Sequence, residues 1–397
     1  MTPNYRTTVC REGWYYLLVL AMVFGGALVR DVNLLLILAG MMVGPVLFSW
    51  RAVRLTLRGL RVRRKVPQGI CAGDLLAVTL GLENTRRRIG SWAVVVEDRL
   101  QREKPADCSE QRGRRSLRPS VLFSYVPAGG AQDGVYRGRL PRRGRYRLGP
   151  LRLSTRFPFG LLRHTITLAE VETLTVFPRL GKLTRAWFAR NRRSLAGAQR
   201  RQQRSGAEGD FYGVRQWRSG DPRRWIHWRN SARSGELVVR QFEQPRNRDV
   251  ALLLDLWRPA EPTRKDLENV ELAVSFAATV VTDLCRKGGT NLSVAAPDGT
   301  PDWIAGPTST ALLNDVMQRL ATAEPHSRDH LPELFAGTLK RIEPGAEIVL
   351  IGTRAVDLDE RSGIASLRSQ PAGRAAAGPV RCIDVSGDEL AEYFEPQ

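Results

Sequence analysis

Two uncharged, apolar runs near the N-terminus constrain this chain more than any other feature. They cover Trp14 to Val29 and Val32 to Trp50, and a turn around Arg30 to Asn33 separates them. A helix needs roughly 17 to 25 residues to cross a bilayer, so each run can form one transmembrane span. A cleaved signal peptide is the rival interpretation, and it is disfavoured because a second apolar run follows almost at once. The pattern predicts a transmembrane hairpin over residues 14–50.

Basic residues follow the second run closely. They are Arg51, Arg54, Arg58, Arg61, Arg63, Arg64 and Lys65. By the positive-inside rule both ends of the hairpin face the cytoplasm, so we expect an inner-membrane protein with residues 1–13 as a cytoplasmic tail. The near-helical spacing of the basic residues predicts a cationic helix over residues 51–65, lying near anionic lipid headgroups. These charges explain much of the formal net charge of +21 without nucleic acid.

Residues 66–180 have the pattern of a β domain. Short apolar or alternating runs, separated by Gly, Pro and charged turns, lie at residues 73–84, 91–100, 120–127 and 134–140. Residues 141–164 add a Gly-rich corner and two further strands. The pattern favours antiparallel sheet over helix, and a small immunoglobulin-like sandwich or barrel is the simplest fold. The five cysteines lie far apart, so they indicate neither a zinc site nor a disulfide framework.

The next two segments are strongly basic. Residues 181–208 contain few bulky apolar side chains and predict a linker or an exposed helix, within which Arg190 to Arg204 is a candidate polyanion-binding stretch. In residues 209–245, arginines alternate with tryptophans, so guanidinium planes can stack on ring faces. This alternation predicts one compact recognition or docking element. Acidic residues such as Asp221 interrupt its positive field, which disfavours nucleic acid as its partner.

Residues 246–397 alternate between strand-like and helix-like patterns. An apolar strand ending near Asp255 opens this segment. Helical patterns cover residues 266–287, 308–324 and 330–341. Strands that alternate with helices imply a parallel sheet with helices on both faces. Because the carboxyl ends of parallel strands meet at one edge, we expect Asp255, Trp257, Arg258 and the loop 352–354 to cluster there.

The run from GDPRRWIHW through NSAR to LVVRQFE resembles the signature of the bacterial family called domain of unknown function 58. The resemblance implies a membrane-anchored protein that ends in a von Willebrand factor A-like α/β domain and is often encoded beside MoxR-type AAA+ ATPases. The molecular activity of that family is unsettled. The signature positions that we expect to contact a partner are Gly220, Asp221, Arg223, Arg224, Trp225, His227, Trp228, Ser231, Ala232, Arg233 and Arg240.

A second segment resembles the same family. Arg143 to Pro150 and Phe157 to Leu161 match a stretch that its members carry at this position in the chain. A docking edge is one interpretation of the stretch, and a structural turn with an aromatic plug is the other. We favour the structural turn, because glycine and proline at strand ends are ordinary turn chemistry.

A von Willebrand factor A-like fold normally carries a DxSxS metal motif at the end of its first strand, where a carboxylate and hydroxyls hold magnesium. Asp255 stands at the corresponding position, but Trp257 and Pro259 replace the hydroxyl ligands, and Arg258 adds a positive charge. A hard cation needs several oxygen ligands in near-octahedral geometry, which this loop alone does not supply. The resemblance therefore points to a degenerate motif, and we expect no bound metal and no other cofactor.

Three classes of function are compatible with the sequence. The chain contains no GxSxG, HExxH or GxxxxGK[ST] motif. The leading hypothesis is therefore a membrane-anchored scaffold or adaptor, without catalytic activity, that docks a MoxR-type AAA+ ATPase. One alternative is a hydrolytic enzyme in which Asp221 orients His227 as the general base, and another is a polyanion-binding module. The sequence indicates neither the client nor the oligomeric state.

Overall fold

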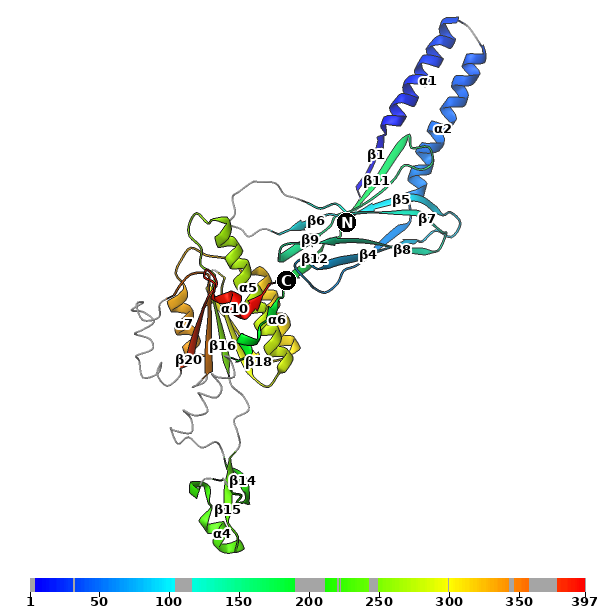
Figure 1. Ribbon diagram of the computed structural model, residues 1–397. Coiled ribbons are helices and arrows are strands. Elements are labelled where there is room, and N and C mark those ends of the chain that lie inside the picture. Colours follow the sequence, from blue (N-terminus) through cyan, green and yellow to red (C-terminus); the bar gives the residue numbers. More distant parts are fainter. Residues whose placement is uncertain are drawn as a thin grey trace. The chain divides into compact units, whose positions relative to one another are not determined.

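The structure, a computed structural model, divides into two compact units, Met1–Phe177 and Pro178–Gln397 (Figure 1). The first unit combines a hairpin of two apolar helices with antiparallel β sheets, and the second is built on a mixed sheet with helices. The description of the chain leaves out residues 1–3, 31–32, 104–115, 190–210, 220, 222, 243–248, 299, 343–345, 357–376 and 397.

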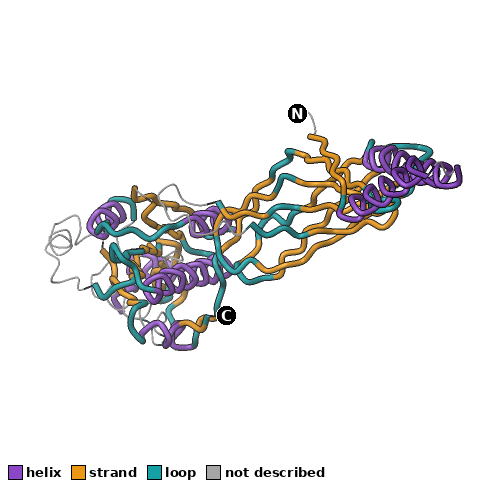
Figure 2. Tube along the Cα trace, turned by 90° about the horizontal axis from the view of Figure 1, so that it is seen from above, coloured by secondary structure: helices purple, strands orange, loops and turns teal. Residues whose placement is uncertain are grey.

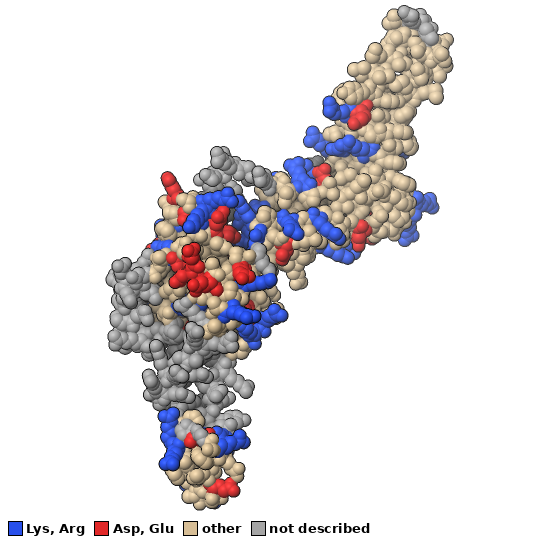
Figure 3. Space-filling view, in the orientation of Figure 1, with Lys and Arg blue, Asp and Glu red and all other residues tan. Residues whose placement is uncertain are grey.

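Two long apolar helices, α1 (Arg11–Arg30) and α2 (Asn33–Leu57), form the hairpin. Both are long and apolar enough to cross a membrane, and only 11% of each apolar window is buried within the protein. A helix that is apolar on all sides normally lies in a protein core or in a membrane. Here the rest of the described protein does not cover the two helices. On the face shown in Figure 3, charged side chains gather at the base of the hairpin, and the described residues farther out show no Lys, Arg, Asp or Glu.

A strand lies within residues 1–13, which the sequence predicted to be a cytoplasmic tail without regular structure. β1 (Asn4–Val9) pairs antiparallel with β11 (Leu162–Leu168), and Thr7 Oγ1 lies 2.8 Å from His164 Nδ1. The prediction was wrong because a strand at the chain end is defined by its partner, which here lies 157 positions away. Since α1 leaves this sheet domain and α2 returns to it, both ends of the hairpin lie on the same side of any membrane that it crosses.

The predicted cationic helix over residues 51–65 is also corrected. α2 ends at Leu57, Gly59 adopts a positive φ of 75°, and β2 (Leu60–Lys65) pairs antiparallel with β4 (Leu75–Asn84). Glycine reaches this left-handed conformation without steric cost, so it commonly ends a helix. In β2 the basic residues alternate between the two faces of the strand, and the Arg64 side chain is only 1% exposed. Arg64 is therefore unavailable to lipid headgroups.

Three sheets make up the β domain. Their strand orders are β1-β11-β10-β5-β7, β3-β12-β9-β6 and β2-β4-β8. The remaining strands are β3 (Ile70–Cys71), β5 (Ser91–Glu97), β6 (Leu100–Arg102), β7 (Ser120–Val126), β8 (Ala131–Arg139), β9 (Gly144–Leu148), β10 (Leu151–Thr155) and β12 (Glu172–Phe177). Their pairs are antiparallel apart from β3 with β12, so the antiparallel architecture predicted for this region is confirmed.

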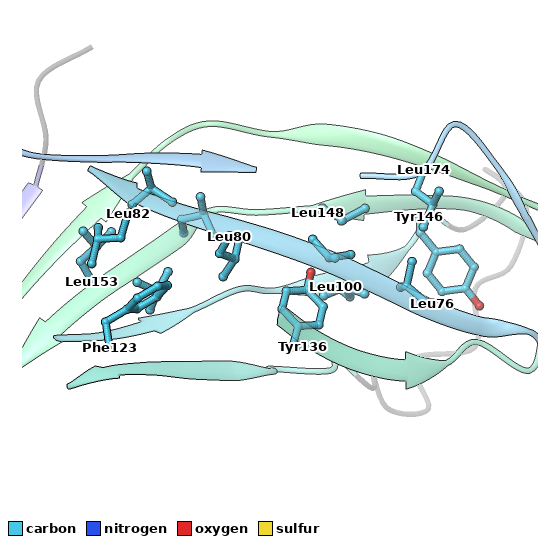
Figure 4. Close-up of a cluster of buried hydrophobic side chains, with 14 of the residues drawn as sticks. Leu76, Leu80, Leu82, Leu100, Phe123, Tyr136, Tyr146, Leu148, Leu153 and Leu174 are labelled. Atoms are coloured by element: carbon cyan, nitrogen blue, oxygen red, sulfur yellow. The ribbon is translucent and has the colours of Figure 1, made fainter. Parts of the chain in front are cut away.

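Alternation along β4 builds the core of the β domain. Leu76, Leu80 and Leu82 are fully buried, and Figure 4 shows them pointing into one interior together with Phe123 and Tyr136. Successive side chains of a strand point to opposite faces, so every second residue of β4 enters this interior. Burial of a large aliphatic side chain contributes about 1.5–3 kcal/mol, which makes this cluster the main source of the domain's stability.

One buried ion pair lies beside the apolar core. Arg64 Nη2 donates to Asp98 Oδ1 at 2.8 Å, and the Tyr136 hydroxyl donates to the other oxygen of Asp98 at 2.7 Å. The backbone N–H of Arg99 donates to Asp98 Oδ1 as well, at 2.8 Å. The Asp98 side chain is fully buried, and burial together with the Asp98 charge raises the pKa of Tyr136. The pair links β2, which follows the hairpin directly, to the domain core.

The second unit contains a five-stranded sheet in the order β18-β17-β16-β19-β20. The strands are β16 (Val250–Asp255), β17 (Asn291–Asp298), β18 (Thr300–Pro307), β19 (Ala346–Gly352) and β20 (Ala377–Asp384). All neighbours are parallel except β17 and β18, which are antiparallel. The prediction of a wholly parallel sheet was wrong here, because residues 300–307 turn back directly after β17 and form an edge strand.

Helices cover both faces of this sheet, as predicted (Figures 1 and 2). They are α5 (Arg264–Lys287), α6 (Thr310–Thr322), α7 (Leu331–Leu339) and the short α10 (Glu389–Tyr393). Phe335 of α7 packs in one cluster with Leu253 and Ile348 of the sheet. Thr263 caps α5 by accepting from the Asp266 N–H, and Asp266 accepts from the Thr263 N–H in return. This capping box explains why the helix starts there.

The prediction of a linker over residues 181–208 was wrong for residues 181–189. β13 (Lys182–Leu183) pairs with β21 (Phe394–Glu395), and residues 185–189 are helical. Trp187 is 4% exposed and packs edge-on against Phe276, with the Arg381 guanidinium 4.2 Å from its ring. The polar composition of this segment was misleading, because burial of the single tryptophan is enough to hold residues 185–189 against the domain. Residues 190–208, with the candidate polyanion-binding stretch Arg190–Arg204, lie outside the described residues.

The buried ion pair generates the first prediction. Arg64→Met should lower the free energy of unfolding by about 3–5 kcal/mol, because the Asp98 carboxylate stays buried without its cation. Arg63→Met is the matched control, since the Arg63 side chain is 76% exposed and its loss should cost no more than about 0.5 kcal/mol. Alkylation of Cys71 in β3 against urea, read by peptide mass spectrometry in detergent, measures the unfolding of this domain. Equal midpoints for the two variants would contradict the prediction.

Candidate functional site

The arginine- and tryptophan-rich segment folds as a small unit, here called the signature module (residues 211–242). β14 (Phe211–Gln216) and β15 (Val238–Phe242) pair antiparallel, and the 3₁₀ turn η1 (Arg223–Trp225) and helix α4 (Trp228–Ser234) lie between them. Ile226 pairs with Val239, and both are buried. The sequence therefore predicted a compact element correctly.

An arginine–aspartate clamp closes the loop after β14. Arg215 donates to both carboxylate oxygens of Asp221, at 2.7 and 2.8 Å, and the Arg218 N–H donates to the same group at 2.9 Å. The hydrogen bond from Arg215 lowers the pKa of Asp221. Such a two-point contact fixes both orientation and distance, so Asp221 holds the loop in shape. Gly220, a further signature position, lies outside the described residues.

His227 is the N-cap of α4. Its Nδ1 accepts a hydrogen bond from the Asn230 N–H at 3.2 Å, and its backbone carbonyl accepts from the Ser231 N–H at 3.0 Å. Ser231 is buried, and its hydroxyl oxygen accepts from the Val238 N–H at 2.9 Å. Gly235 ends the helix with a positive φ of 73°. In the described residues, Asp221 and His227 therefore bond to different partners, and both serve the shape of the module.

The outer surface of the module carries the other signature side chains. The exposed residues include Arg218, Arg223, Arg224, Trp228, Arg229, Ala232, Arg233 and Arg240. Trp228 is 67% exposed, while Trp225 is half-buried with the Arg224 guanidinium 5.9 Å from its ring centre. Figure 3 shows Lys and Arg side chains on the visible face of this module. The described surface thus combines positive charge with exposed aromatic area.

A second polar cluster lies at the carboxyl end of the central strand β16. Asp255 is fully buried there, and Arg354 Nε donates to Asp255 Oδ2 at 3.2 Å. The same guanidinium donates to Asp329 Oδ1 at 2.7 Å and lies 4.9 Å from the ring centre of Trp257. The Thr353 hydroxyl donates to the Trp257 carbonyl at 2.5 Å. The predicted clustering of Asp255 and Trp257 with the loop 352–354 is confirmed, and Arg258 lies beside it, since its backbone N–H donates to the His326 carbonyl at 2.8 Å.

Sequence reasoning missed two members of this cluster, His326 and Asp329. His326 Nδ1 lies 2.7 Å from the Arg328 carbonyl, so Nδ1 carries the proton, and Nε2 lies 3.9 Å from Asp255 Oδ1. Burial raises the pKa of Asp255, with Arg354 opposing, and burial lowers the pKa of His326. The run HSRDH at residues 326–330 could have drawn attention, because it concentrates two histidines and an aspartate in one short turn.

These residues do not fit a magnesium ion. The Arg354 guanidinium already supplies the positive charge next to Asp255, and Trp257 offers no side-chain oxygen. Mg²⁺ needs near-octahedral oxygen ligands, and a guanidinium at the same carboxylate would repel it. Within the described residues, no group of three or more His, Cys, Asp or Glu side chains has an arrangement able to hold a metal ion. Arg354 occupies the role that a cation would have at Asp255.

A protein-family comparison covers both the signature module and the first strands of the sheet. The family model described as protein of unknown function DUF58 matches residues 213–357. The match confirms the resemblance that the signature indicated. No curated protein matches the chain.

Solved structures resemble parts of the chain weakly. A β-glucosidase from Listeria innocua in complex with gluconolactone is 12% identical over 30% of this chain and 16% of its own length, with a TM-score of 0.20. A CARDB domain from Pyrococcus furiosus is 10% identical over 30% of this chain and 95% of its own, with a TM-score of 0.19. A superoxide reductase (neelaredoxin) from Ignicoccus hospitalis is 13% identical over 29% and 78%, also at 0.19. Likenesses at these TM-scores carry no functional argument.

The cap of α4 generates a prediction about His227. His227→Ala should destabilise the helix by about 0.5–2 kcal/mol, because the Asn230 N–H loses its acceptor. His227→Asn should recover most of that loss, because asparagine is a good N-cap residue but lacks the imidazole. Hydrogen exchange of the amides in residues 228–234 reports both effects locally. Equal exchange rates in wild type and His227→Ala would show that the His227 side chain does not act as a cap.

The cluster at Asp255 generates a prediction about Arg354 and magnesium. Arg354→Ala should cost about 3–5 kcal/mol of unfolding free energy, because it leaves a buried carboxylate without its cation. The control Arg264→Ala should have almost no effect, since the Arg264 side chain is 93% exposed. Thermal unfolding of the wild type should be the same with Mg²⁺ as with EDTA, because a bound ion would raise the midpoint. A midpoint raised by Mg²⁺ would show that a cation binds.

Proposed function

We propose that this protein, which carries a DUF58 family domain at residues 213–357, is a membrane-anchored scaffold or adaptor that presents a docking surface to a partner protein. The partner is a MoxR-type AAA+ ATPase, the class of protein with which the resembling family is associated. No catalytic activity of its own is proposed. Since the sequence has no GxxxxGK[ST] motif, any ATP-driven step would come from the partner.

The anchoring half of the proposal has structural support. The apolar helices α1 and α2 expose large side chains along their length, and the strands on either side of them, β1 and β2, belong to one domain. Exposed Arg51, Arg54 and Arg58 at the end of α2 favour a cytoplasmic location by the positive-inside rule. The proposed topology is a two-pass inner-membrane protein with its N-terminus and both folded units in the cytoplasm.

Finer fold assignments belong to the same proposal. The three sheets around one apolar core are compatible with an immunoglobulin-like sandwich. The sheet order β18-β17-β16-β19-β20, with helices on both faces, is compatible with a von Willebrand factor A-like domain. In that frame Asp255 stands at the metal position, and the guanidinium of Arg354 makes the domain independent of magnesium. Docking would then use side chains rather than a shared metal ion.

The proposal of a docking surface rests on one observation: different residues of the signature module hold its shape and form its exposed surface. Asp221, His227 and Ser231 hold its shape through hydrogen bonds, while Arg223 and Arg224 have exposed side chains. Arginine and tryptophan dominate the energetics of many protein interfaces, because each combines a large contact area with directional polar groups. The net positive charge of this surface favours an acidic face on the partner.

The proposal is tested by affinity purification of the detergent-extracted, full-length protein. Wild type should recover an AAA+ ATPase, identified by mass spectrometry, and Arg223→Ala/Arg224→Ala should lose most of it. The matched control is Arg137→Ala/Arg139→Ala, which removes two exposed arginines from β8 and should retain the partner.

Two outcomes would contradict the proposal. Equal recovery from wild type and from the Arg223 and Arg224 variant would remove the signature module as the docking surface. Absence of any specific partner from the wild type would count against the scaffold and favour the hydrolytic alternative. Hydrogen exchange of the module in the variant verifies that its fold is retained.

A further inference from the structure

The loop between β10 and β11, with the sequence FPFGL (residues 157–161), lies against both helices of the hairpin. The Cys10 N–H, at the start of α1, donates to the Leu161 carbonyl at 2.9 Å. Gly13 of α1 packs so closely on this loop that an added Cβ would come within 2.2 Å of the Leu161 oxygen. On the other helix, the ring of Phe48 lies 6.2 Å from the ring of Phe159. Residues 157–161 therefore contact both helices at the base of the hairpin.

The contacts of residues 157–161 extend to the apolar part of the helices. Leu161 forms a cluster with Val53 against which Tyr16 and Val46 also pack. Val46 precedes Arg51, the first charged residue after the apolar run of α2, by five positions. At about 1.5 Å of rise per residue, this places Val46 about 7.5 Å on the apolar side of that charge. A loop of the β domain therefore lies at the depth of the apolar span.

The loop exposes an aromatic side chain at this depth. Phe159 is 56% exposed, and the nearby helix ends expose Trp14, Tyr15 and Trp50 by 64%, 65% and 44%. Aromatic side chains concentrate where the hydrocarbon of a bilayer meets the headgroups. A turn that only joined two strands would not need an exposed phenylalanine beside an apolar helix. Phe159 extends the aromatic belt of the helices onto the β domain.

Positive charge borders the loop on the side away from the apolar span. Arg156, directly before the loop, is exposed, and Arg54 holds its guanidinium 4.2 Å from the Trp50 ring centre. Burial raises the pKa of the Cys10 thiol, and the positive charge of Arg156 opposes that rise. Arginines at such a level attract the phosphates of anionic lipids.

We propose that residues 157–161 form a membrane-interfacial loop that inserts Phe159 among the lipids beside α2. The occupant of this exposed apolar surface is the bilayer itself, because the surface is continuous with the lipid-facing side of the hairpin. The loop holds the β domain on the membrane at two points, the helices and Phe159, which restricts its rotation about the hairpin. This inference rests on the proposed membrane anchoring and adds a lipid contact from outside the helices.

Site-specific fluorescence quenching tests the loop. The full-length chain, with its five native cysteines replaced by alanine, receives one cysteine by Phe159→Cys, Phe48→Cys or Val135→Cys. Phe48 is exposed on α2 and reports on the anchor, while Val135 is exposed on β8, where it pairs with Thr79. Each cysteine carries the fluorophore NBD in vesicles of phosphatidylethanolamine and phosphatidylglycerol. The quenchers are a lipid with a nitroxide near its headgroup and aqueous iodide.

The lipid nitroxide should quench the probes at positions 159 and 48 by similar factors. Iodide should quench the probe at position 135 several-fold more strongly than it quenches the other two probes. Quenching at position 159 by iodide alone, with position 48 still quenched by the lipid, would overturn the interfacial loop and leave the anchor intact. Quenching of all three positions by iodide alone would overturn the anchor itself. The two failures are therefore distinguishable.

Discussion

The buried ion pair between Arg64 and Asp98 makes the strand after the hairpin part of the β domain core. A charge removed from water is costly unless a partner of opposite sign meets it with good geometry. Here Asp98 also accepts from the Tyr136 hydroxyl and the Arg99 N–H, so its two oxygens are both satisfied. Because β2 follows α2 after a short turn, this network fixes the point at which the chain leaves the hairpin and enters the sheet.

The β domain also holds the chain where it enters the hairpin, before α1. β1 joins the same domain before α1 begins, and the loop 157–161 packs on both helices. A pair of apolar helices with a free linker would leave a folded domain to move independently of the membrane. The contacts at Gly13 and Phe48 join the helices to the β domain instead, so the helical hairpin and the sheets form one unit.

Some polar residues of the second unit stabilise its local structure, and others are exposed on its surface. In the hydrolytic alternative, His227 would be the general base and Asp221 would orient it; in the structure, Asp221 stabilises a local turn and His227 stabilises a helix end. At the sheet edge the guanidinium of Arg354 neutralises Asp255, where the resembling fold would place a divalent cation. Both observations favour recognition by side chains over metal-dependent or hydrolytic chemistry as the proposed function.

Local sequence patterns were enough to predict the apolar helices, the alternating strand β4, the buried strand β16 and the meeting of Asp255 with the loop 352–354. Hydrophobic periodicity and the shared edge of parallel strands suffice for these. The folded chain was needed to see that residues 4–9, 60–65 and 300–307 are strands, that His326 lies beside Asp255 and that Asp329 binds Arg354. An edge strand or a loop side chain is stabilised by partners distant in the chain, and no local pattern encodes such partners.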